Sequence, residues 1–354
     1  MKFIHIADVH LGVTPDAGFK WSEKRAKEIW DSFGRIVGLA REQEADLLLI
    51  AGDLFHRQPL VRELKEVDYL FSTLTNTQVV LIAGNHDYLK DGSNYWNFPW
   101  SENVHFLYQQ ECESVFFPEL NTRVYGLSYH TREITQPLYD ELVPVKDGSC
   151  SILLAHGGDA RHIPIDRRKL ALAGFDYIAL GHIHKPQVLI RDKMQYCGAI
   201  GALDRDDTGI HGHVEGIIEN GKVRARFVPD EGREYKELDI RVDSGSTDLS
   251  VMQQISEKME LLGRKHFYKI RLAGFRDPDI IFNIKRYYEL GQVADVRDET
   301  EPDYDFTVLE EEYRDGIIGE YIRQLKGDAL MDHLDEITKK ALYYGVQALL
   351  ETKE

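Results

Sequence analysis

Residues 46–56 read Asp-Leu-Leu-Leu-Ile-Ala-Gly-Asp-Leu-Phe-His, and this stretch decides the fold. The apolar run Leu47–Ala51 is short and uninterrupted, as in a strand that is buried on both faces of a parallel sheet. Gly52 then permits a tight turn of the backbone, and the next residue is the carboxylate Asp53. The stretch therefore predicts an α/β fold in which a buried strand delivers an acidic side chain at its carboxyl end.

Four further stretches end a predicted strand with side chains that can bind metal. They are Asp8-Val9-His10, Gly84-Asn85-His86-Asp87, Ala155-His156-Gly157 and Gly181-His182-Ile183-His184. A lone histidine after a strand is usually structural, but five such segments in one chain are hard to explain by packing. With Asp53 they offer two carboxylates, one amide and four imidazoles as ligands, and His86 is left over. This set predicts two adjacent cations, which implies hydrolysis of a phosphate ester.

Hydrolysis of a phosphodiester needs an activated water, neutralised phosphoryl oxygens and a proton for the departing alkoxide. Two cations about 3.5–4 Å apart meet the first two needs and turn water into the nucleophile. The cations need a shared anion, because their repulsion would otherwise separate them, and we assign Asp53 to that bridge. Mixed oxygen and nitrogen donors suit Mn²⁺, Fe or Zn²⁺, whereas the absence of thiolates argues against a structural zinc site.

Strand and helix patterns alternate through the first half of the chain, which is typical of an α/β fold. Asn220-Gly221 lies between two strand patterns and predicts a hairpin turn. Beyond a boundary at residues 229–232 there follow a β-α-β-α-β pattern, an acidic segment with Pro302, and two helices. The helices that we expect cover residues 23–41, 61–74, 166–173, 249–262, 278–290, 308–325 and 330–350. The expected parts of the chain are 1–232, 233–299 and 300–354, the last beginning with a linker at 300–305.

Composition describes an ordinary globular protein of 354 residues, long enough for two or three domains. No apolar run approaches the length of a membrane span and no signal peptide precedes the first strand, so we expect no membrane contact. Cys112, Cys150 and Cys197 form no CxxC motif and are odd in number, which favours a reducing cytoplasm over a disulfide framework.

The net charge of −17 disfavours a nucleic-acid partner, because binding phosphates normally requires a basic surface. The charge is unevenly distributed, since residues 299–354 alone hold fifteen acidic and six basic side chains. Over half of the excess negative charge therefore lies in this C-terminal segment. The charge weakens the prediction of a DNA partner without excluding it.

The order D-x-H, G-D, G-N-H-D, H and G-H-x-H resembles the calcineurin-like metallophosphoesterase superfamily over residues 1–210. Asp8–Gly12, Ala51–His56 and Gly84–Asp87 further resemble the SbcD-type DNA repair exonucleases, in particular their YhaO-like bacterial branch. Tyr196-Cys197-Gly198 stands where those relatives commonly have Tyr-Pro-Gly. The resemblance implies a sandwich of two mixed β-sheets flanked by helices, with a small α+β cap domain and a C-terminal helical pair.

Carried over by position, the resemblance assigns a set of ligands to each of two divalent cations, with Mn²⁺ favoured over Fe or Zn²⁺. One set is Asp8, His10, Asp53 and His184, and the other is Asp53, Asn85, His156 and His182. His86 corresponds to the catalytic histidine that donates a proton to the leaving oxygen, a role that suits an imidazole near neutral pH. His56 corresponds to a second histidine that helps to position the substrate.

The resemblance also implies macromolecular partners. The substrate would be DNA, degraded by an exonuclease with endonuclease activity left open. Our candidates for contacts with DNA phosphates are Arg264, Lys265, Lys269 and Arg271. A homodimer is expected through residues 60–74 and 95–100, and an SMC-like (SbcC-type) ATPase is expected to bind the C-terminal helices. The alternatives are a phosphatase or small-nucleotide phosphodiesterase, and a non-catalytic scaffold for such an ATPase.

Other histidines and aromatic residues form no constellation with these motifs. His5 lies in the first strand and is expected to be buried. A solvated position is expected for His130, His162, His211, His213 and His333. Several aromatic side chains after the G-N-H-D motif could stack on bases, although packing in the core or in a dimer explains them as well: Tyr95, Trp96, Phe98 and Trp100.

Overall fold

The computed structural model describes residues 1–327 and 334–352. The chain divides into two compact units, Met1–Tyr235 and Lys236–Glu354. The part predicted to carry the chemistry lies in the first unit, and the predicted cap and C-terminal helices lie in the second. The division into three parts stays a prediction.

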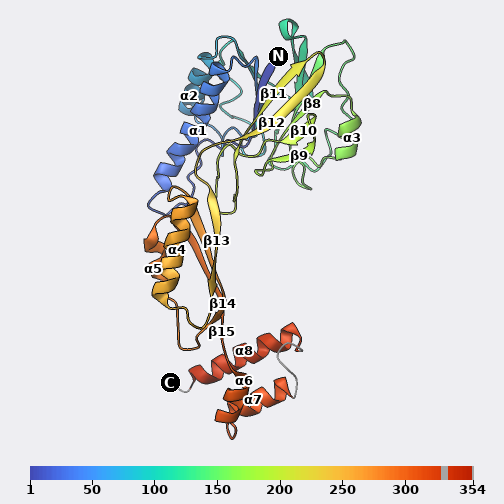
Figure 1. The fold of residues 1–354 in the computed structure, drawn as a ribbon. Coiled ribbons are helices and arrows are strands. Elements are labelled where there is room, and N and C mark those ends of the chain that lie inside the picture. Colours follow the sequence, from blue (N-terminus) through green and yellow to red (C-terminus); the bar gives the residue numbers. More distant parts are fainter. Residues whose placement is uncertain (328–333, 353–354) are drawn as a thin grey trace. The chain divides into compact units, whose positions relative to one another are not determined.

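Two six-stranded sheets face each other in the first unit (Figure 1). The strands of the first sheet are β1 (Lys2–Ile6), β2 (Leu47–Ala51), β3 (Gln78–Ile82), β4 (Val104–Phe106), β11 (Gly212–Glu219) and β12 (Lys222–Pro229). Those of the second are β5 (Glu113–Phe117), β6 (Thr122–Gly126), β7 (Cys150–His156), β8 (Tyr177–Gly181), β9 (Gln187–Ile190) and β10 (Met194–Tyr196).

The two sheets are mixed, with strand orders β12-β11-β1-β2-β3-β4 and β5-β6-β7-β8-β10-β9. In the first sheet β1 to β4 pair in parallel, whereas β11 is antiparallel to β1 and forms the expected hairpin with β12. In the second sheet β6, β7, β8 and β10 are parallel neighbours, with β5 and β9 antiparallel at the edges. The predicted sandwich of two mixed sheets is therefore confirmed.

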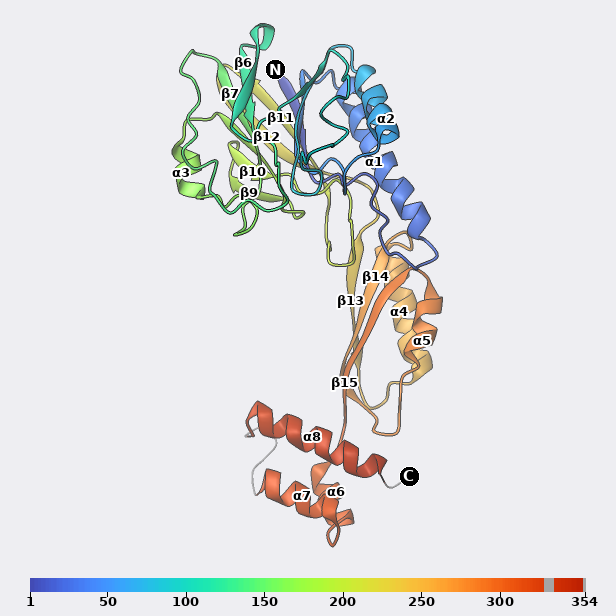
Figure 2. The same cartoon turned by 180° about the vertical axis from the view of Figure 1, so that it is seen from behind.

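Helices cover the outer faces of both sheets. They are α1 (Ser22–Glu42), α2 (Val61–Ser72) and α3 (Arg167–Leu172), and Figures 1 and 2 show α3 on the side opposite α1 and α2. Alternate side chains of β2 explain this order of layers. Leu48 and Ile50 pack in the cluster that contains the helical residue Phe33, whereas Leu47 and Leu49 pack against the second sheet. The run Leu47–Ala51 is buried throughout, as its composition predicts.

The second unit contains a three-stranded sheet of β13 (Tyr235–Val242), β14 (Phe267–Arg276) and β15 (Val293–Pro302), whose first strand starts at the last residue of the first unit. Its helices are α4 (Asp248–Leu262) and the short α5 (Ile284–Tyr287), which continues as the 3₁₀ turn η2 (Tyr288–Leu290), and they lie on one face of the sheet (Figure 2). We call residues 235–302 the cap.

Two predictions for the cap are wrong. The helix expected at 278–290 begins only at Ile284, because the Asp277 side chain and carbonyl accept hydrogen bonds from the amides of Asp279 and Ile280 and form a turn instead. The linker expected at 300–305 is shorter, because residues 300–302 still pair with β14 at the end of β15. Proline is tolerated there because β15 is an edge strand of its sheet.

The C-terminal helices are α6 (Phe306–Glu312), α7 (Ile317–Lys326) and α8 (Glu336–Glu351). The single helix predicted at 308–325 is thus divided in two. The break comes at Gly316, whose backbone is extended and which has a low propensity for helix. The predicted start of the last helix at residue 330 and the predicted position of His333 lie outside the described residues. Within the described ranges no helix has both the length and the apolar character that crossing a membrane requires.

Candidate metal centre

The predicted ligands lie at the carboxyl ends of strands from both sheets, where α/β folds usually bind ligands. They follow or end β1, β2, β3, β7 and β8, and the residues nearest these strands are Asp8, Asp53, Asn85, His156 and His182. The Asp8 amide donates to the Gly52 carbonyl at 3.1 Å, which ties the first two loops together. Nδ1 of His156 lies 2.8 Å from the Ala51 carbonyl and joins the two sheets.

Asp53 lies at the centre of these residues. Its Oδ2 is 3.6 Å from Nε2 of His10 and 3.4 Å from Nε2 of His156. Its Oδ1 accepts a hydrogen bond from the backbone amide of His86 at 2.8 Å. One carboxylate oxygen thus faces an imidazole from each predicted ligand set, which is the placement that a bridging ligand requires.

The other predicted ligands surround this carboxylate in two groups. Donor atoms of Asp8, His10 and His184 lie within 4.8 Å of one another. Oδ1 of Asn85 lies 3.0 Å from Nε2 of His156 and 3.1 Å from Nδ1 of His182. The seven residues that the sequence singles out as ligands are therefore brought together, although their binding of metal stays a prediction.

Four of the seven have a left-handed backbone conformation that side chains rarely adopt. The φ angles are 51° at Asp8, 52° at His10, 51° at Asp53 and 94° at His182. Such conformations cost on the order of 1–3 kcal/mol each and gather at functional sites. The presence of a possible metal ligand at each of these four positions favours a functional role over simple packing.

Two glycines allow the ligand side chains to approach the backbone closely. A Cβ atom at Gly84 would lie 2.2 Å from Oδ1 of Asp53, and one at Gly52 would lie 2.4 Å from Nδ1 of His156. Gly52 also has a φ of 90°. Any larger residue would displace the central carboxylate or the neighbouring imidazole.

The buried carboxylates and imidazoles of the centre shift one another's pKa values. Burial opposes a charge on His156, but the adjacent Asp53 carboxylate raises the pKa of this imidazole to about 9. Burial alone would raise the pKa of Asp53, yet the nearby His156 and His10 hold it well below its usual range. Burial raises the pKa of Asp8 to about 6, against the opposing effect of nearby histidines.

His10 provides the clearest sign that the centre suits a metal. Its Nε2 is buried and has no hydrogen-bond partner among the described residues, while its Nδ1 lies 3.2 Å from Nδ1 of His56. Burial lowers the pKa of His10 well below its usual value, so the ring is neutral. An unpartnered, neutral imidazole nitrogen beside a carboxylate is a suitable ligand for Mn²⁺, Fe or Zn²⁺.

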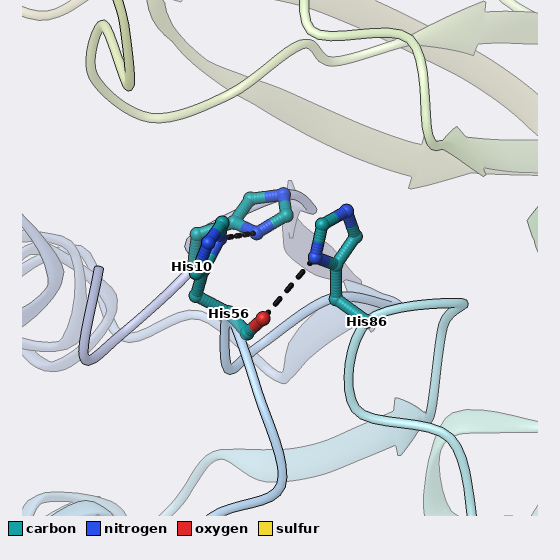
Figure 3. A group of neighbouring side chains, drawn as sticks. All are labelled: His10, His56 and His86. Atoms are coloured by element: carbon teal, nitrogen blue, oxygen red, sulfur yellow. Dashed lines mark hydrogen bonds between the residues drawn. The ribbon is translucent and has the colours of Figure 1, made fainter. Parts of the chain in front are cut away.

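His86 lies beside the predicted ligand His10 and beside His56 (Figure 3). Nδ1 of its ring is 3.1 Å from the His56 carbonyl oxygen, which leaves Nε2 available to exchange a proton. Its ring centroid lies 4.7 Å from that of His10 and 5.0 Å from that of His56. His86 is partly exposed and His56 is exposed, as proton transfer to a substrate would require.

Three carboxylates to which the sequence assigns no role lie in or beside the centre. Asp159 is 2.7 Å from Nε2 of His182, and Asp207 is 3.0 Å from Nδ1 of His184. Asp87 accepts hydrogen bonds from the Gly84 amide and the Tyr95 hydroxyl, both at 2.8 Å. Asp87 stands inside the G-N-H-D motif and could have been found there, whereas the other two lie in loops without a recognisable pattern.

The remaining predictions for histidines have mixed outcomes. His5 is fully buried, as expected. The solvated position predicted for His211 and His213 is wrong, because β11 begins at Gly212 and both rings are 4% exposed. His162 is only partly exposed and its Nδ1 lies 2.8 Å from Asp159. His130 is also partly exposed and contacts the Tyr108 carbonyl.

The aromatic residues after the G-N-H-D motif pack mainly within the first unit. Tyr95 is completely buried, and Phe98 and Trp100 pack against the same core cluster. Trp96 is 39% exposed and stacks on Tyr108. For Tyr95 the packing explanation is therefore the right one.

The basic residues predicted to contact DNA are largely engaged by acidic neighbours in the cap. Arg264 pairs with Glu260. Arg271 lies 2.8 Å from Asp239 and 3.7 Å from Glu299. Lys265 is exposed, and Lys269 lines a shallow cavity on β13, β14 and β15 together with four carboxylates: Glu237, Asp239, Asp295 and Glu299. Contact of these residues with DNA stays a prediction.

Comparison with known proteins places this chain in a family. The family model described as "Calcineurin-like phosphoesterase" matches residues 1–186, more than half of the chain. The uncharacterized metallophosphoesterase YhaO of Bacillus subtilis is 28% identical over 286 residues, which cover 75% of this chain and 69% of that protein.

Two archaeal relatives bear the name DNA double-strand break repair protein Mre11. The Methanocaldococcus jannaschii protein is 31% identical over 195 residues, covering 52% of each chain. The Archaeoglobus fulgidus protein is 29% identical over 328 residues, covering 82% of this chain and 71% of that protein. With the family model spanning the strands and loops that build the metal centre, the chain belongs to the calcineurin-like phosphoesterase family.

Proposed function

We propose that the chain is a metal-dependent DNA nuclease of the SbcD type that hydrolyses phosphodiesters in DNA repair. The observation that carries the proposal is the position of Asp53 Oδ2 between Nε2 of His10 and Nε2 of His156. DNA as the substrate is supported by the names of two relatives, which refer to repair of double-strand breaks. Exonuclease activity is the main expectation.

The seven ligand residues would hold two divalent cations, preferably Mn²⁺, which supply an activated water and neutralise the phosphoryl oxygens when bound. Asp8, His10, Asp53 and His184 would hold one, and Asp53, Asn85, His156 and His182 the other. Asp53 would belong to both sets.

His86 is the proposed general acid. Its Nδ1 donates to the His56 carbonyl, so in the protonated ring the proton on Nε2 is the one that would pass to the departing oxygen, which leaves the ring neutral. The amide of His86 donates to Asp53, which fixes the distance between the acid and the metal centre. His56 contacts His10 and is exposed, which suits a residue that positions the substrate.

The proposed partners are a second copy of the chain and an SMC-like (SbcC-type) ATPase. Large apolar side chains are exposed on and next to α2, namely Val61, Tyr69 and Trp96, which supports the dimer. Others are exposed on the C-terminal helices, namely Val308, Ile317, Ile337 and Tyr344, which supports the ATPase.

Hydrolysis of defined substrates tests the function. The chain loaded with Mn²⁺ is incubated with end-labelled linear duplex DNA, single-stranded DNA, bis-p-nitrophenyl phosphate and p-nitrophenyl phosphate. We expect nucleotides to be released from DNA and the diester to be cleaved. Asp53→Asn serves as the control for contaminating nucleases and should be inactive. Turnover of the monoester alone would contradict the proposal and would identify a phosphatase.

A further inference from the structure

Two carboxylates outside the predicted ligand sets each contact one histidine of the metal centre. Oδ2 of Asp159 lies 2.7 Å from Nε2 of His182, and Oδ2 of Asp207 lies 3.0 Å from Nδ1 of His184. Both aspartates lie in loops outside the five sequence motifs. Neither has a role in the mechanism proposed above.

The two contacts involve opposite nitrogens of two histidines that are only two positions apart. Asp159 holds Nε2 of His182, so Nδ1 is left facing Oδ1 of Asn85 at 3.1 Å. Asp207 holds Nδ1 of His184, so Nε2 is left for the group formed with Asp8 and His10. A neutral imidazole carries one proton, and a carboxylate keeps that proton on the nitrogen that it contacts. The lone pair of the other nitrogen is then directed at the metal position.

Each carboxylate is itself held in place by neighbouring groups. Oδ1 of Asp159 accepts hydrogen bonds from the amides of Arg161 at 2.7 Å and His162 at 3.0 Å. Oδ2 of Asp207 accepts one from the Leu203 amide at 3.1 Å. The side chain of Asp159 is 46% exposed and that of Asp207 is 12% exposed. Asp159 can therefore be replaced at little cost to the fold, whereas Asp207 also anchors its loop.

We propose that Asp159 and Asp207 are positioning residues that set the affinities of the two cation positions separately. Asp159 acts on the position ligated by His182, and Asp207 acts on the position ligated by His184. The proposal deepens the proposed function and rests on the ligand sets named there. Each aspartate fixes one histidine in the tautomer and orientation that bind metal. Loss of either aspartate therefore lowers the affinity for one cation and leaves the affinity for the other unchanged.

A different use of the same atoms has to be separated from this one. Asp159, His162 and His182 have donor atoms within 4.8 Å of one another and could hold a cation themselves. In that arrangement Nε2 of His182 would bind metal in place of donating a proton to Asp159. The two uses differ in the number of cations per chain and in the effect of removing His162.

Titration of the full chain with Mn²⁺, followed by calorimetry and by the electron paramagnetic resonance of free Mn²⁺, tests the proposal. Asp159→Ala should lower the affinity for one of the two Mn²⁺ ions about 10- to 100-fold and leave the affinity for the other unchanged. Asp159→Asn, whose amide oxygen still accepts from His182, should recover part of this affinity. Asp207→Asn should also lower the affinity for one Mn²⁺ ion. Circular dichroism verifies that each variant is folded.

Double variants identify which position each aspartate controls. Asp159→Ala should have no further effect in a His182→Ala background and its full effect in a His184→Ala background. Asp207→Asn should show the reverse pattern. A residue with a merely structural role would lower the affinity in both backgrounds. His162→Ala is the matched control, because it removes a neighbour of Asp159 while leaving the contact with His182, and it should bind two Mn²⁺ ions as the parent does.

Three results would overturn the proposal. The first is wild-type affinity for both ions in Asp159→Ala and Asp207→Asn. The second is an equal loss of affinity for both ions in each variant. The third is a third equivalent of Mn²⁺ that disappears in His162→Ala, since Asp159 would then ligate a cation directly. A parent chain that binds two Mn²⁺ ions but cleaves no DNA would contradict the proposed function and leave this inference standing.

Discussion

Asp53 and His86 contact each other through the side chain of Asp53 and the backbone of His86. The contact runs from the backbone amide of His86 to Oδ1 of Asp53, so it survives removal of the imidazole. The imidazole of His86 contacts the backbone carbonyl of His56 and stacks on the His56 ring. Proton donation by the ring can therefore be separated from binding of metal.

His86→Ala should retain both Mn²⁺ ions and lower kcat for DNA about 10²- to 10⁴-fold, the usual contribution of a general acid. Metal content is measured by mass spectrometry and kcat on end-labelled duplex DNA. His130→Ala is the matched control, because the ring of this partly exposed histidine contacts the Tyr108 carbonyl and the Trp96 ring, so the variant should keep full activity. Full activity in His86→Ala would contradict the assignment of the acid.

A second prediction at the residue scale concerns pH and His5. This histidine is completely buried and its Nδ1 lies 3.0 Å from the Tyr177 hydroxyl. Burial lowers the pKa of His5 to about 3, while in the unfolded chain it has its ordinary value near 6.5. Between these values the unfolded chain binds more protons, so the stabilising effect is complete above pH 6.5 and is lost as the pH falls toward 3.

The parent chain should therefore lose about 2 kcal/mol of stability from His5 alone between pH 7.5 and pH 5. His5→Gln, which keeps a hydrogen-bonding side chain without the titration, should lose correspondingly less over the same range. Urea unfolding at the two pH values, with a chelator present to exclude metal binding, measures the difference. Identical pH dependence in the two proteins would show that His5 is protonated at no cost in the folded state.

At the scale of the elements, the glycines at strand ends determine how close the ligands can approach. Gly84→Ala would place a Cβ atom 2.2 Å from Oδ1 of Asp53. We expect weaker binding of both Mn²⁺ ions and a loss of about 1–3 kcal/mol of stability, because close-packed atoms must shift. Mn²⁺ titration and urea unfolding measure the two effects.

Gly34→Ala is the matched control, because its Cβ would meet no atom within 4 Å in α1. It should leave Mn²⁺ binding unchanged and stabilise the helix by up to about 1 kcal/mol. If Gly84→Ala bound Mn²⁺ as tightly as Gly34→Ala, the packing of Asp53 against this loop would be irrelevant to the metal centre.

The elements that place the ligands could be predicted because their sequences are strongly patterned. The run Leu47–Ala51 is apolar at every position and ends in Gly52 and Asp53, so both the strand and the ligand at its end were evident. Hydrogen bonds between distant loops leave no such pattern. Asp159 reaches His182 from 23 positions away, and nothing in its local sequence indicates the contact.

The elements of the second unit were predicted less well because local polar contacts and glycines decide their ends. Asp277 forms a turn where a helix was expected, and Gly316 divides another helix. In β15 the acidic residues resembled a linker, yet the strand continues to Pro302 because its backbone pairs with β14. Periodicity alone does not reveal these competing interactions.

At the scale of the whole molecule, the C-terminal helices have a core of their own. The cluster built on Phe306, Ile318, Ile322, Leu342 and Val346 has all its described members within residues 304–350. Deletion of residues 306–354 should therefore leave Mn²⁺ binding and turnover of bis-p-nitrophenyl phosphate unchanged, and should abolish binding of an SbcC-type ATPase. Copurification and diester hydrolysis measure the two. Loss of diester hydrolysis in a soluble product would show that the helices contribute to the active centre.

Two cations that share Asp53 are the central feature of the proposed metal centre, and the electron paramagnetic resonance of bound Mn²⁺ tests for them most directly. Two Mn²⁺ ions that share a carboxylate are magnetically coupled, and the spectrum differs from that of isolated ions. We expect two coupled Mn²⁺ ions per chain in the parent protein and no coupled pair in Asp53→Asn. A single Mn²⁺ ion in the parent chain, or an unchanged coupled pair in Asp53→Asn, would contradict this expectation.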